Sequence, residues 1–304
     1  MKKISSFFLY LYAILFLFSF CKTSNANFIT NSNLDHHKFS IKENGIQPIV
    51  ILSAQNPNGE QKLTELSFVI DTGSNISLIK KNLFTHSGQK KIFRLKSISG
   101  ETEKESIEIK LNLFDKKNNL ILANSIFHSL DISSRFDFDG IIGNDILENF
   151  DLFIELPDNI FLLKTTDTKQ NLEGFKKIPL LVSEGHIIFQ IKIKNSPCRL
   201  LFDTGAGISY LKTEKAKELN LKMGGKASFL DLEGNQIDTI YHIGENLCVD
   251  ENICQKKIDL LSGNSIEDFL SNEENLDGIL GQNWISQYSI LIDYRNKSLY
   301  IKQR

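Results

Sequence analysis

The sequence has little proline, little glycine and almost no net charge. Its 304 residues include 5 Pro and 18 Gly, which excludes collagen-like and proline-rich proteins. The formal net charge of -2 leaves no basic surface of the kind that binds nucleic acid. Hydrophobic residues make up 41% of the chain, enough to bury a core and to exclude intrinsic disorder. The length corresponds to one large domain or to two of about 140 residues.

Several familiar site signatures are also missing. The sequence has no C-x-x-C pair, no Cys/His cluster with zinc spacing and no H-E-x-x-H, so we expect no metal and no other cofactor. Without a G-x-S-x-G, a serine hydrolase has no support. Gly205-Ala206-Gly207 starts like a dinucleotide fingerprint, but Tyr210 stands where the third glycine belongs, so no nucleotide site is expected.

The N-terminus has the pattern of an export signal. Two lysines precede the uncharged apolar run of residues 4–20, and residues 24–26 form a small-x-small cleavage site. We therefore expect residues 1–26 to be a signal peptide and the protein to be exported to the periplasm or cell envelope. If it stays uncleaved, the run is a short membrane anchor, and no second apolar run is long enough to span a bilayer.

Cys21 offers an alternative fate for the same segment. A cysteine directly after an apolar run resembles a bacterial lipoprotein site, where a lipid on Cys21 would anchor the protein to a membrane. The residue before such a site is small, whereas here it is Phe20. Removal and lipidation of Cys21 both stay open.

The other three cysteines lie in the second half of the chain. Cys248 and Cys254 flank five residues and have the spacing of a hairpin tip closed by a disulfide, which an exported compartment permits. The alternative is that both, together with Cys198, are free thiols that act as small apolar residues.

An internal repeat organises the chain. Three features occur twice in the same order: an apolar segment that ends in Asp-Thr-Gly, an Asp-Gly-Ile-x-Gly element, and an apolar run broken by a turn. They occupy residues 68–79, 139–145 and 150–164 in the first half, and 201–211, 277–283 and 288–302 in the second. The repeat predicts two duplicated lobes, residues 27–164 and 178–304, joined by a polar linker at 165–177.

The local pattern indicates strands rather than helices. Residues 187–194 alternate between apolar and polar side chains, which is the period of a half-buried strand. Helices are expected to be few and short. The best candidate is Thr213–Leu219, with Thr213 as the N-cap, and a second short helix is expected after each Gly-Ile-x-Gly.

The two Asp-Thr-Gly turns carry a specific chemistry. A buried strand brings the carboxylate of Asp71 or Asp203 into the interior, and the glycine of each turn permits a tight bend. If the halves pack about a pseudo-twofold axis, the two carboxyl groups meet and share one proton. One can then act as a base on water and the other as an acid, which hydrolyses a peptide bond without a metal.

These motifs resemble the retropepsin-like aspartic proteases, in a two-lobed, pepsin-like arrangement within one chain. The resemblance covers residues 39–304. It implies an all-β, bilobal acid-protease fold of two homologous β-barrel-like lobes with few short helices. It also assigns roles to the residues of the two turns: Asp71 and Asp203 are catalytic, and Thr72, Gly73, Ser74, Thr204 and Gly205 support them.

The resemblance further implies flaps, which are hairpins that close over the substrate. The candidates lie around Gly100 in the first lobe and Gly234 in the second, and the first lobe has no tyrosine of the pepsin kind. The fourth residue of the turn is Ser74 in one repeat and Ala206 in the other. We therefore expect the Ser74 hydroxyl to hydrogen-bond one carboxylate only.

The function that the sequence predicts is an exported aspartic endopeptidase, active as a monomer on peptide or protein substrates. A single-lobe relative must dimerise to pair two aspartates, whereas this chain carries both. The alternative is a catalytically inactive, protease-like protein that binds a peptide or a partner. Intact Asp-Thr-Gly in both repeats favours the enzyme.

Overall fold

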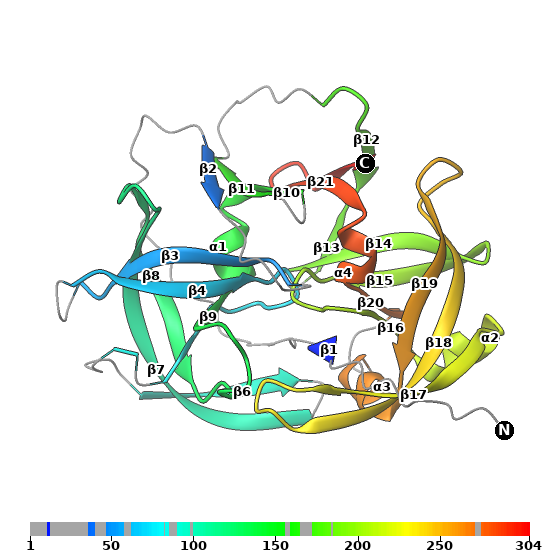
Figure 1. Ribbon diagram of the computed structural model, residues 1–304, viewed down its shortest axis with the longest axis horizontal. Coiled ribbons are helices and arrows are strands. Elements are labelled where there is room, and N and C mark those ends of the chain that lie inside the picture. The colour runs from blue at the N-terminus through cyan, green and yellow to red at the C-terminus, as the bar shows by residue number, and fades with distance from the viewer. Residues whose placement is uncertain are drawn as a thin grey trace, which may run out of the picture.

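The computed structural model describes residues 11–12, 36–39, 47–57, 62–81, 83–84, 90–97, 100–155, 159–164, 172–183, 185–270 and 275–304. They form mainly β-strands, arranged as two lobes that lie side by side beneath a shared sheet (Figure 1). The prediction of an all-β, bilobal protein is confirmed. Within the predicted signal peptide only β1 (Leu11–Tyr12) is described, paired in parallel with β17 (Lys222–Leu230).

The first lobe is a seven-stranded sheet with the order β3-β4-β9-β5-β8-β7-β6. Its strands are β3 (Ile49–Gln55), β4 (Thr64–Ile70), β5 (Leu78–Lys80), β6 (Lys90–Ser97), β7 (Gly100–Phe114), β8 (Leu120–Leu130) and β9 (Gly140–Ile142). Strand β4 ends directly before Asp71 and pairs in parallel with β9, and β5 pairs in parallel with β8. The Asp-Thr-Gly turn therefore leaves a central strand of the lobe.

The second lobe repeats this arrangement in a nine-stranded sheet with the order β1-β17-β18-β19-β16-β20-β15-β14-β13. Its further strands are β13 (Leu181–Ser183), β14 (His186–Ile193), β15 (Ser196–Phe202), β16 (Ser209–Leu211), β18 (Gln236–Cys248), β19 (Cys254–Ser262) and β20 (Gly278–Leu280). Strand β15 ends directly before Asp203 and pairs in parallel with β20, and β16 pairs in parallel with β19. The strands around each aspartate are thus connected in the same way.

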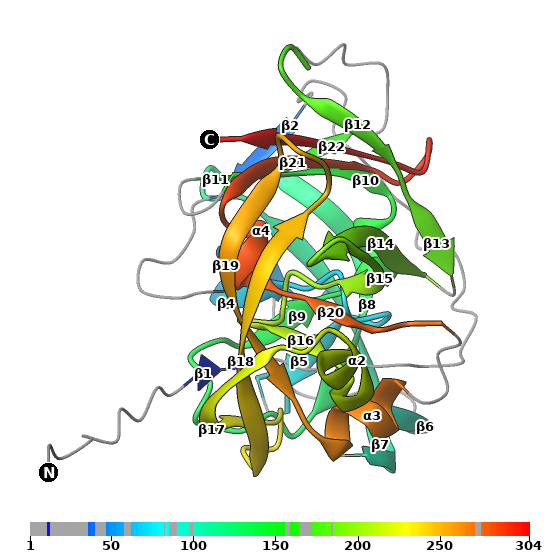
Figure 2. The same ribbon diagram turned by 90° about the vertical axis from the view of Figure 1, so that its right-hand side faces the viewer.

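A third sheet joins the two halves. Its order is β12-β22-β21-β10-β11-β2, built from β2 (His36–Phe39), β10 (Phe150–Glu155), β11 (Asn159–Lys164), β12 (Lys176–Pro179), β21 (Tyr288–Asp293) and β22 (Ser298–Gln303). The central neighbours β10 and β21 come from different repeats and pair antiparallel. Figure 2 shows this sheet across one end of the molecule. The predicted linker at 165–177 ends inside this sheet because β12 begins at Lys176, and residues 165–171 lie outside the described residues.

Four short helices occur among the described residues: α1 (Asn144–Leu147), α2 (Thr213–Glu218), α3 (Asn264–Leu270) and α4 (Gln282–Ile285). Helices α1 and α4 follow the two Gly-Ile-x-Gly elements, as predicted. The prediction of Thr213 as an N-cap is wrong, because the cap is Lys212. The backbone N–H of Thr213 instead donates to Glu267 Oε1 of α3, at 2.8 Å.

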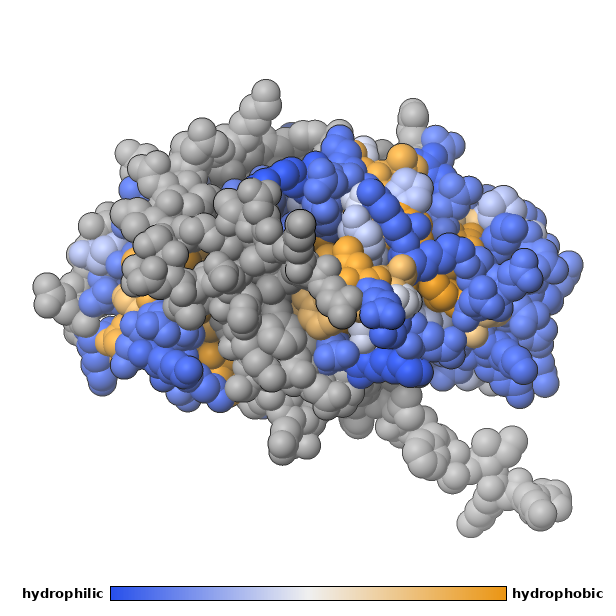
Figure 3. All heavy atoms as spheres, turned by 90° about the horizontal axis from the view of Figure 1, so that it is seen from above, coloured by the Kyte–Doolittle hydropathy of each residue, from blue (hydrophilic) through white to orange (hydrophobic). Residues whose placement is uncertain are grey.

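Two apolar clusters make up the core. One runs through both lobes and the shared sheet, and the other joins residues of the two lobes near the Asp-Thr-Gly turns, including Val69, Ile132, Leu201 and Leu232. Seen from the side of the shared sheet, much of the second lobe is covered by hydrophilic side chains, with smaller hydrophobic patches (Figure 3). Among the described residues, no helix has the length and apolarity needed to cross a membrane.

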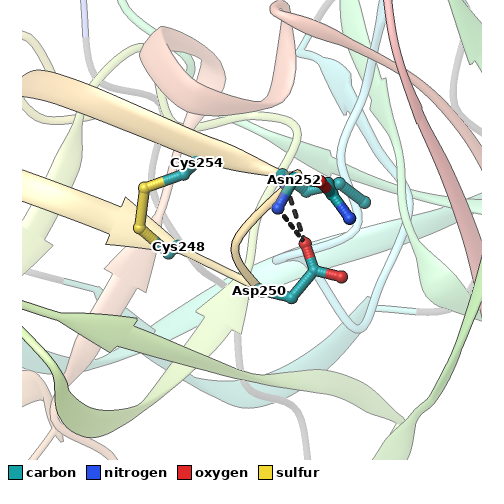
Figure 4. The surroundings of a disulfide bond; sticks show 5 residues. Cys248, Asp250, Asn252 and Cys254 are labelled. Carbon is teal, nitrogen blue, oxygen red and sulfur yellow. Dashed lines mark hydrogen bonds between the residues drawn. A yellow bond between two sulfur atoms is a disulfide. The ribbon is translucent and has the colours of Figure 1, made fainter.

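The β18–β19 hairpin carries a disulfide. Cys248 and Cys254 face each other in the strand register and are bonded, so the structure selects the disulfide over the free thiols (Figure 4). Inside the loop, Asp250 Oδ1 accepts the backbone N–H of Asn252 at 2.9 Å. Cys198 is a buried free thiol, in agreement with the apolar role considered for it.

Candidate active site

The first Asp-Thr-Gly turn is held by backbone hydrogen bonds. The N–H of Asp71 donates to the carbonyl of Ile142 in β9 at 3.0 Å, which ties the end of β4 to the Gly-Ile-x-Gly element. The Asp71 Oδ1 atom accepts the N–H groups of Gly73 at 2.8 Å and Ser74 at 3.2 Å. The carboxyl group is 1% exposed, so its orientation is set by the turn and not by solvent.

The second turn repeats this geometry. The N–H of Asp203 donates to the carbonyl of Leu280 in β20 at 3.0 Å. The Asp203 Oδ1 atom accepts the N–H groups of Gly205 at 2.7 Å and Ala206 at 3.0 Å. In both aspartates, no donor among the described residues reaches Oδ2, although that atom is buried. Each carboxyl group therefore has one anchored oxygen and one available oxygen.

Thr72 and Thr204 lock the two turns together. The hydroxyl of Thr72 donates to the carbonyl of Phe202 at 2.8 Å, and that of Thr204 donates to the carbonyl of Ile70 at 2.7 Å. Each hydroxyl oxygen also accepts the backbone N–H of the other threonine, at 3.1 and 3.0 Å. All of these groups are buried, so the four hydrogen bonds hold the turns across the boundary between the repeats.

The two carboxyl groups meet at this boundary. A Cβ atom added to Gly205 would lie 2.4 Å from Cγ of Asp71, so only glycine allows the second turn to approach this closely. The two carboxyls lie close enough for each to shift the pKa of the other. The structure therefore brings together the two residues that the sequence predicted as a pair.

Burial and mutual interaction separate the acidities of the pair. Burial is the largest cause that raises the pKa of both carboxyls above the usual range for aspartate. The negative charge of Asp71 raises the pKa of Asp203 further, whereas the hydrogen bond from Asp203 lowers the pKa of Asp71. This direction favours the proton on Asp203 and the negative charge on Asp71.

The Ser74 hydroxyl does not take the role expected from the sequence. It donates to the carbonyl of Ile76 at 2.7 Å, while the bond from Ser74 to Asp71 comes from its backbone N–H. A serine hydroxyl readily bonds a backbone group two residues away, and Asp71 Oδ1 already accepts two N–H donors. The predicted difference between Ser74 and Ala206 at the carboxylates is therefore wrong.

Two residues that support the Asp-Thr-Gly turns were not predicted from the sequence. The side-chain amide of Asn144 in α1 donates to the carbonyl of Thr72 at 2.6 Å, and that of Gln282 in α4 donates to the carbonyl of Thr204 at 2.7 Å. Both residues directly follow Gly-Ile-x-Gly, so a carboxamide at the same place in each repeat was the available signal. Each of these side chains therefore holds one Asp-Thr-Gly turn through the carbonyl of its threonine.

The structure describes the tip of the flap candidate around Gly234 but not that of the candidate around Gly100. Gly100 opens β7 opposite Ser97, and the hairpin tip at residues 98–99 lies outside the described residues. Gly234 lies in the tip that joins β17 to β18, with a positive φ of 84°. Within this tip, Asp231 accepts the N–H groups of Glu233 and Asn235 at 3.0 and 2.8 Å, which gives it a defined turn.

The second tip docks on the first lobe. The N–H of Ser133 donates to the carbonyl of Leu232 at 2.9 Å, and Arg135 Nη1 donates to the carbonyl of Gly234 at 3.0 Å. Lys104 forms an ion pair with Glu233. The hairpin tip of the second lobe is therefore fastened to the first lobe.

No metal site accompanies the pair: among the described residues, no group of three or more His, Cys, Asp or Glu side chains has the geometry to hold an ion. No curated protein matches the chain in sequence. The family model of the retroviral aspartyl proteases matches residues 181–304, which contain the second Asp-Thr-Gly turn and its Gly-Ile-x-Gly element. This match supports a retropepsin-like family for residues 181–304.

Proposed function

We propose that the protein is an aspartic endopeptidase in which Asp71 and Asp203 activate a water molecule. The observation that carries the proposal is the pair itself. Two buried carboxyls from two repeats approach each other, each with Oδ1 anchored by backbone N–H groups and Oδ2 reached by no donor among the described residues. Such a pair can hold one proton and one negative charge next to a bound water.

The higher pKa of Asp203 suits it to act as the acid, and the lower pKa of Asp71 suits it to act as the base. Asp71 removes a proton from the water, whose oxygen bonds to the peptide carbonyl carbon, while Asp203 gives its proton to the carbonyl oxygen. Asp71 then passes the proton to the amide nitrogen and the C–N bond breaks. The hydroxyl proton of the intermediate returns to Asp203, which restores the starting state of the pair.

The proposal includes export and a monomeric state. Residues 1–26 are proposed to be removed as a signal peptide, or Cys21 to be lipidated, which places the protein in the periplasm or cell envelope. N-terminal sequencing and mass spectrometry of the protein from a cell-envelope fraction separate the two outcomes. Because both aspartates come from one chain, activity should not depend on protein concentration through dimerisation.

The experiment uses the protein from residue 27 onward, incubated with denatured protein at pH 3 to 7 in ¹⁸O-water. We expect internal cleavage with one ¹⁸O atom per new carboxyl terminus, and its loss in Asp71→Asn and Asp203→Asn. The control is Asp115→Asn, in the exposed β7–β8 turn, which should cleave like the wild type. Cleavage that survives both substitutions would overturn the proposal, and peptide binding without turnover would support the non-catalytic alternative.

A further inference from the structure

A side chain of the first lobe reaches into the second Asp-Thr-Gly turn. Gln47 lies just before β3, is 7% exposed, and donates from Nε2 to the carbonyl oxygen of Gly205 at 2.9 Å. The two residues are 158 positions apart in the chain. A buried amide that crosses between the repeats to a backbone atom of the turn can influence how that turn holds its carboxylate.

The acceptor belongs to the peptide group that also binds Asp203. The carbonyl that accepts from Gln47 and the N–H of Ala206 are the two ends of one peptide bond. That N–H donates to Asp203 Oδ1 at 3.0 Å. Hydrogen bonds in such a chain polarise one another, so a donor at the carbonyl strengthens the bond that the N–H gives to the carboxylate.

The matching place in the other strand pair holds a different residue. Ile49 pairs with Val69 in the first lobe, and Ile188 pairs with Leu201 in the second, each partner two residues before its aspartate. This register makes His186 the counterpart of Gln47. The Nδ1 atom of His186 lies 3.5 Å from Nδ2 of Asn75, so this contact across the repeats ends on a side chain and not on a peptide of the turn.

We propose that Gln47 is a positioning residue for Asp203: through the peptide of Gly205 and Ala206 it holds the Asp203 carboxyl and stabilises its ionised form. This role rests on the proposed function for its meaning in catalysis. It distinguishes the two aspartates by a contact that lies outside the Asp-Thr-Gly motif.

The direction of the effect follows from the groups around Asp203. Asp71 and the buried hydroxyl of Tyr210 face it, and Tyr294 lies on the side of Asp71. Asp71 disfavours a charge on Asp203, whereas the N–H groups of Gly205 and Ala206 favour it. Removing the Gln47 amide weakens one of the favourable contacts, so the upper pKa of the pair should rise.

The test compares the wild type with Gln47→Met, which keeps the length of the side chain but has no donor. Protein labelled with carbon-13 at aspartate Cγ is titrated by NMR, with Asp203→Asn for assignment. We expect the upper pKa of the pair to rise by about 0.5, a change of about 3-fold in proton affinity. The reason is that the hydrogen bond from the Ala206 N–H to Asp203 should lose roughly a fifth of its strength without the polarisation by Gln47. His186→Met is the control and should leave that pKa unchanged.

Activity supplies an independent readout. If the wild type cleaves peptides, the alkaline limb of kcat/KM against pH should move upward by the same amount in Gln47→Met, with KM unchanged. A purely structural role would lower activity at every pH and leave the limb in place. If Gln47→Met does not fold, Gln47→Asn replaces it. The shorter side chain of asparagine keeps the amide but cannot reach the carbonyl oxygen of Gly205, which Gln47 contacts at 2.9 Å.

The two proposals can fail separately. A wild type that cleaves nothing would overturn the proposed function, while the NMR titration would still decide the role of Gln47. An upper pKa that stays at the wild-type value in folded Gln47→Met or Gln47→Asn would overturn the positioning role, whether or not the protein is a protease.

Discussion

Asp145 and Asn283 occupy the same place in the two repeats and make the same hydrogen bond. Asp145 Oδ1 accepts the hydroxyl of Ser77 at 2.7 Å, and Asn283 Oδ1 accepts the hydroxyl of Ser209 at 2.8 Å. The backbone N–H of the same serine donates to Asp145 Oδ2 at 3.1 Å in the first repeat and to Asn283 Oδ1 at 2.9 Å in the second. One repeat therefore has a titratable carboxyl where the other has a neutral amide.

This difference predicts a pH-dependent stability that originates in the first lobe. Burial is the main cause that raises the pKa of Asp145 to about 7, and the charge of Glu148 adds to it. A carboxyl whose pKa is higher in the folded protein than in the unfolded chain favours folding at acid pH. That contribution is lost as the pH rises from about 4 to about 7.

Asp145→Asn should remove this decrease in stability with rising pH, because asparagine does not titrate. We expect the free energy of unfolding of this variant to exceed that of the wild type by about 4 kcal/mol at pH 8, with the difference vanishing near pH 4. Urea unfolding at several pH values measures it. Asn283→Asp is the matched control and should introduce the same dependence into the second lobe. A difference between Asp145→Asn and wild type that does not change with pH would contradict the explanation.

Gly205→Ala should disable the pair without unfolding the protein. The added Cβ would lie 2.4 Å from Cγ of Asp71, so one turn must move. A displacement of about 1 Å at reacting groups lowers turnover by roughly 100-fold, and we expect a loss of at least this size in kcat. Gly263→Ala is the control, because its nearest neighbour would be an ordinary 3.5 Å away. Equal kcat in both variants would argue against the close approach.

The docked hairpin tip should open more readily when its partners on the first lobe are removed. Arg135→Ala and Lys104→Ala each delete a contact to the tip at Glu233 and Gly234. Because such exposed contacts contribute up to about 1 kcal/mol, amide hydrogen exchange of the tip should become about 3-fold to 5-fold faster. Lys110→Ala, at an exposed position of the same strand as Lys104, is the control. Unchanged exchange in the double variant would mean that the tip is held by other contacts.

The disulfide should stabilise the second lobe. Cys248 and Cys254 close a loop with a sequence separation of 6, and a loop of this length is worth about 2 kcal/mol in the free energy of unfolding. Urea unfolding of the wild type should therefore shift by that amount on adding a thiol reductant. The variant with both cysteines replaced by serine should show the lower stability with and without reductant. A reductant effect that persists in this variant would point to another cause.

The local patterns in the sequence determined much of the fold. Alternating apolar residues predicted strands, and the short helices after Gly-Ile-x-Gly appear as α1 and α4. The duplicated Asp-Thr-Gly named Asp71 and Asp203 as one pair. These features can be predicted because strand period and tight turns depend on neighbouring residues, and because a repeat is found by comparing one half of the sequence with the other.

Tertiary structure decided the contacts that distinguish one repeat from the other. Ser74 had two acceptors within reach, and the geometry of its turn selected Ile76. Gln47 and Gly205 are in contact although they are 158 positions apart in the chain, and no local sequence pattern predicts a contact over that separation. The sequence by itself determined that two carboxyls would face each other. Only the packing of the two lobes decided which distant groups support the turns, such as Gln47 at Gly205 and Thr72 at Phe202, because these partners are far apart in the chain and adjacent only after folding.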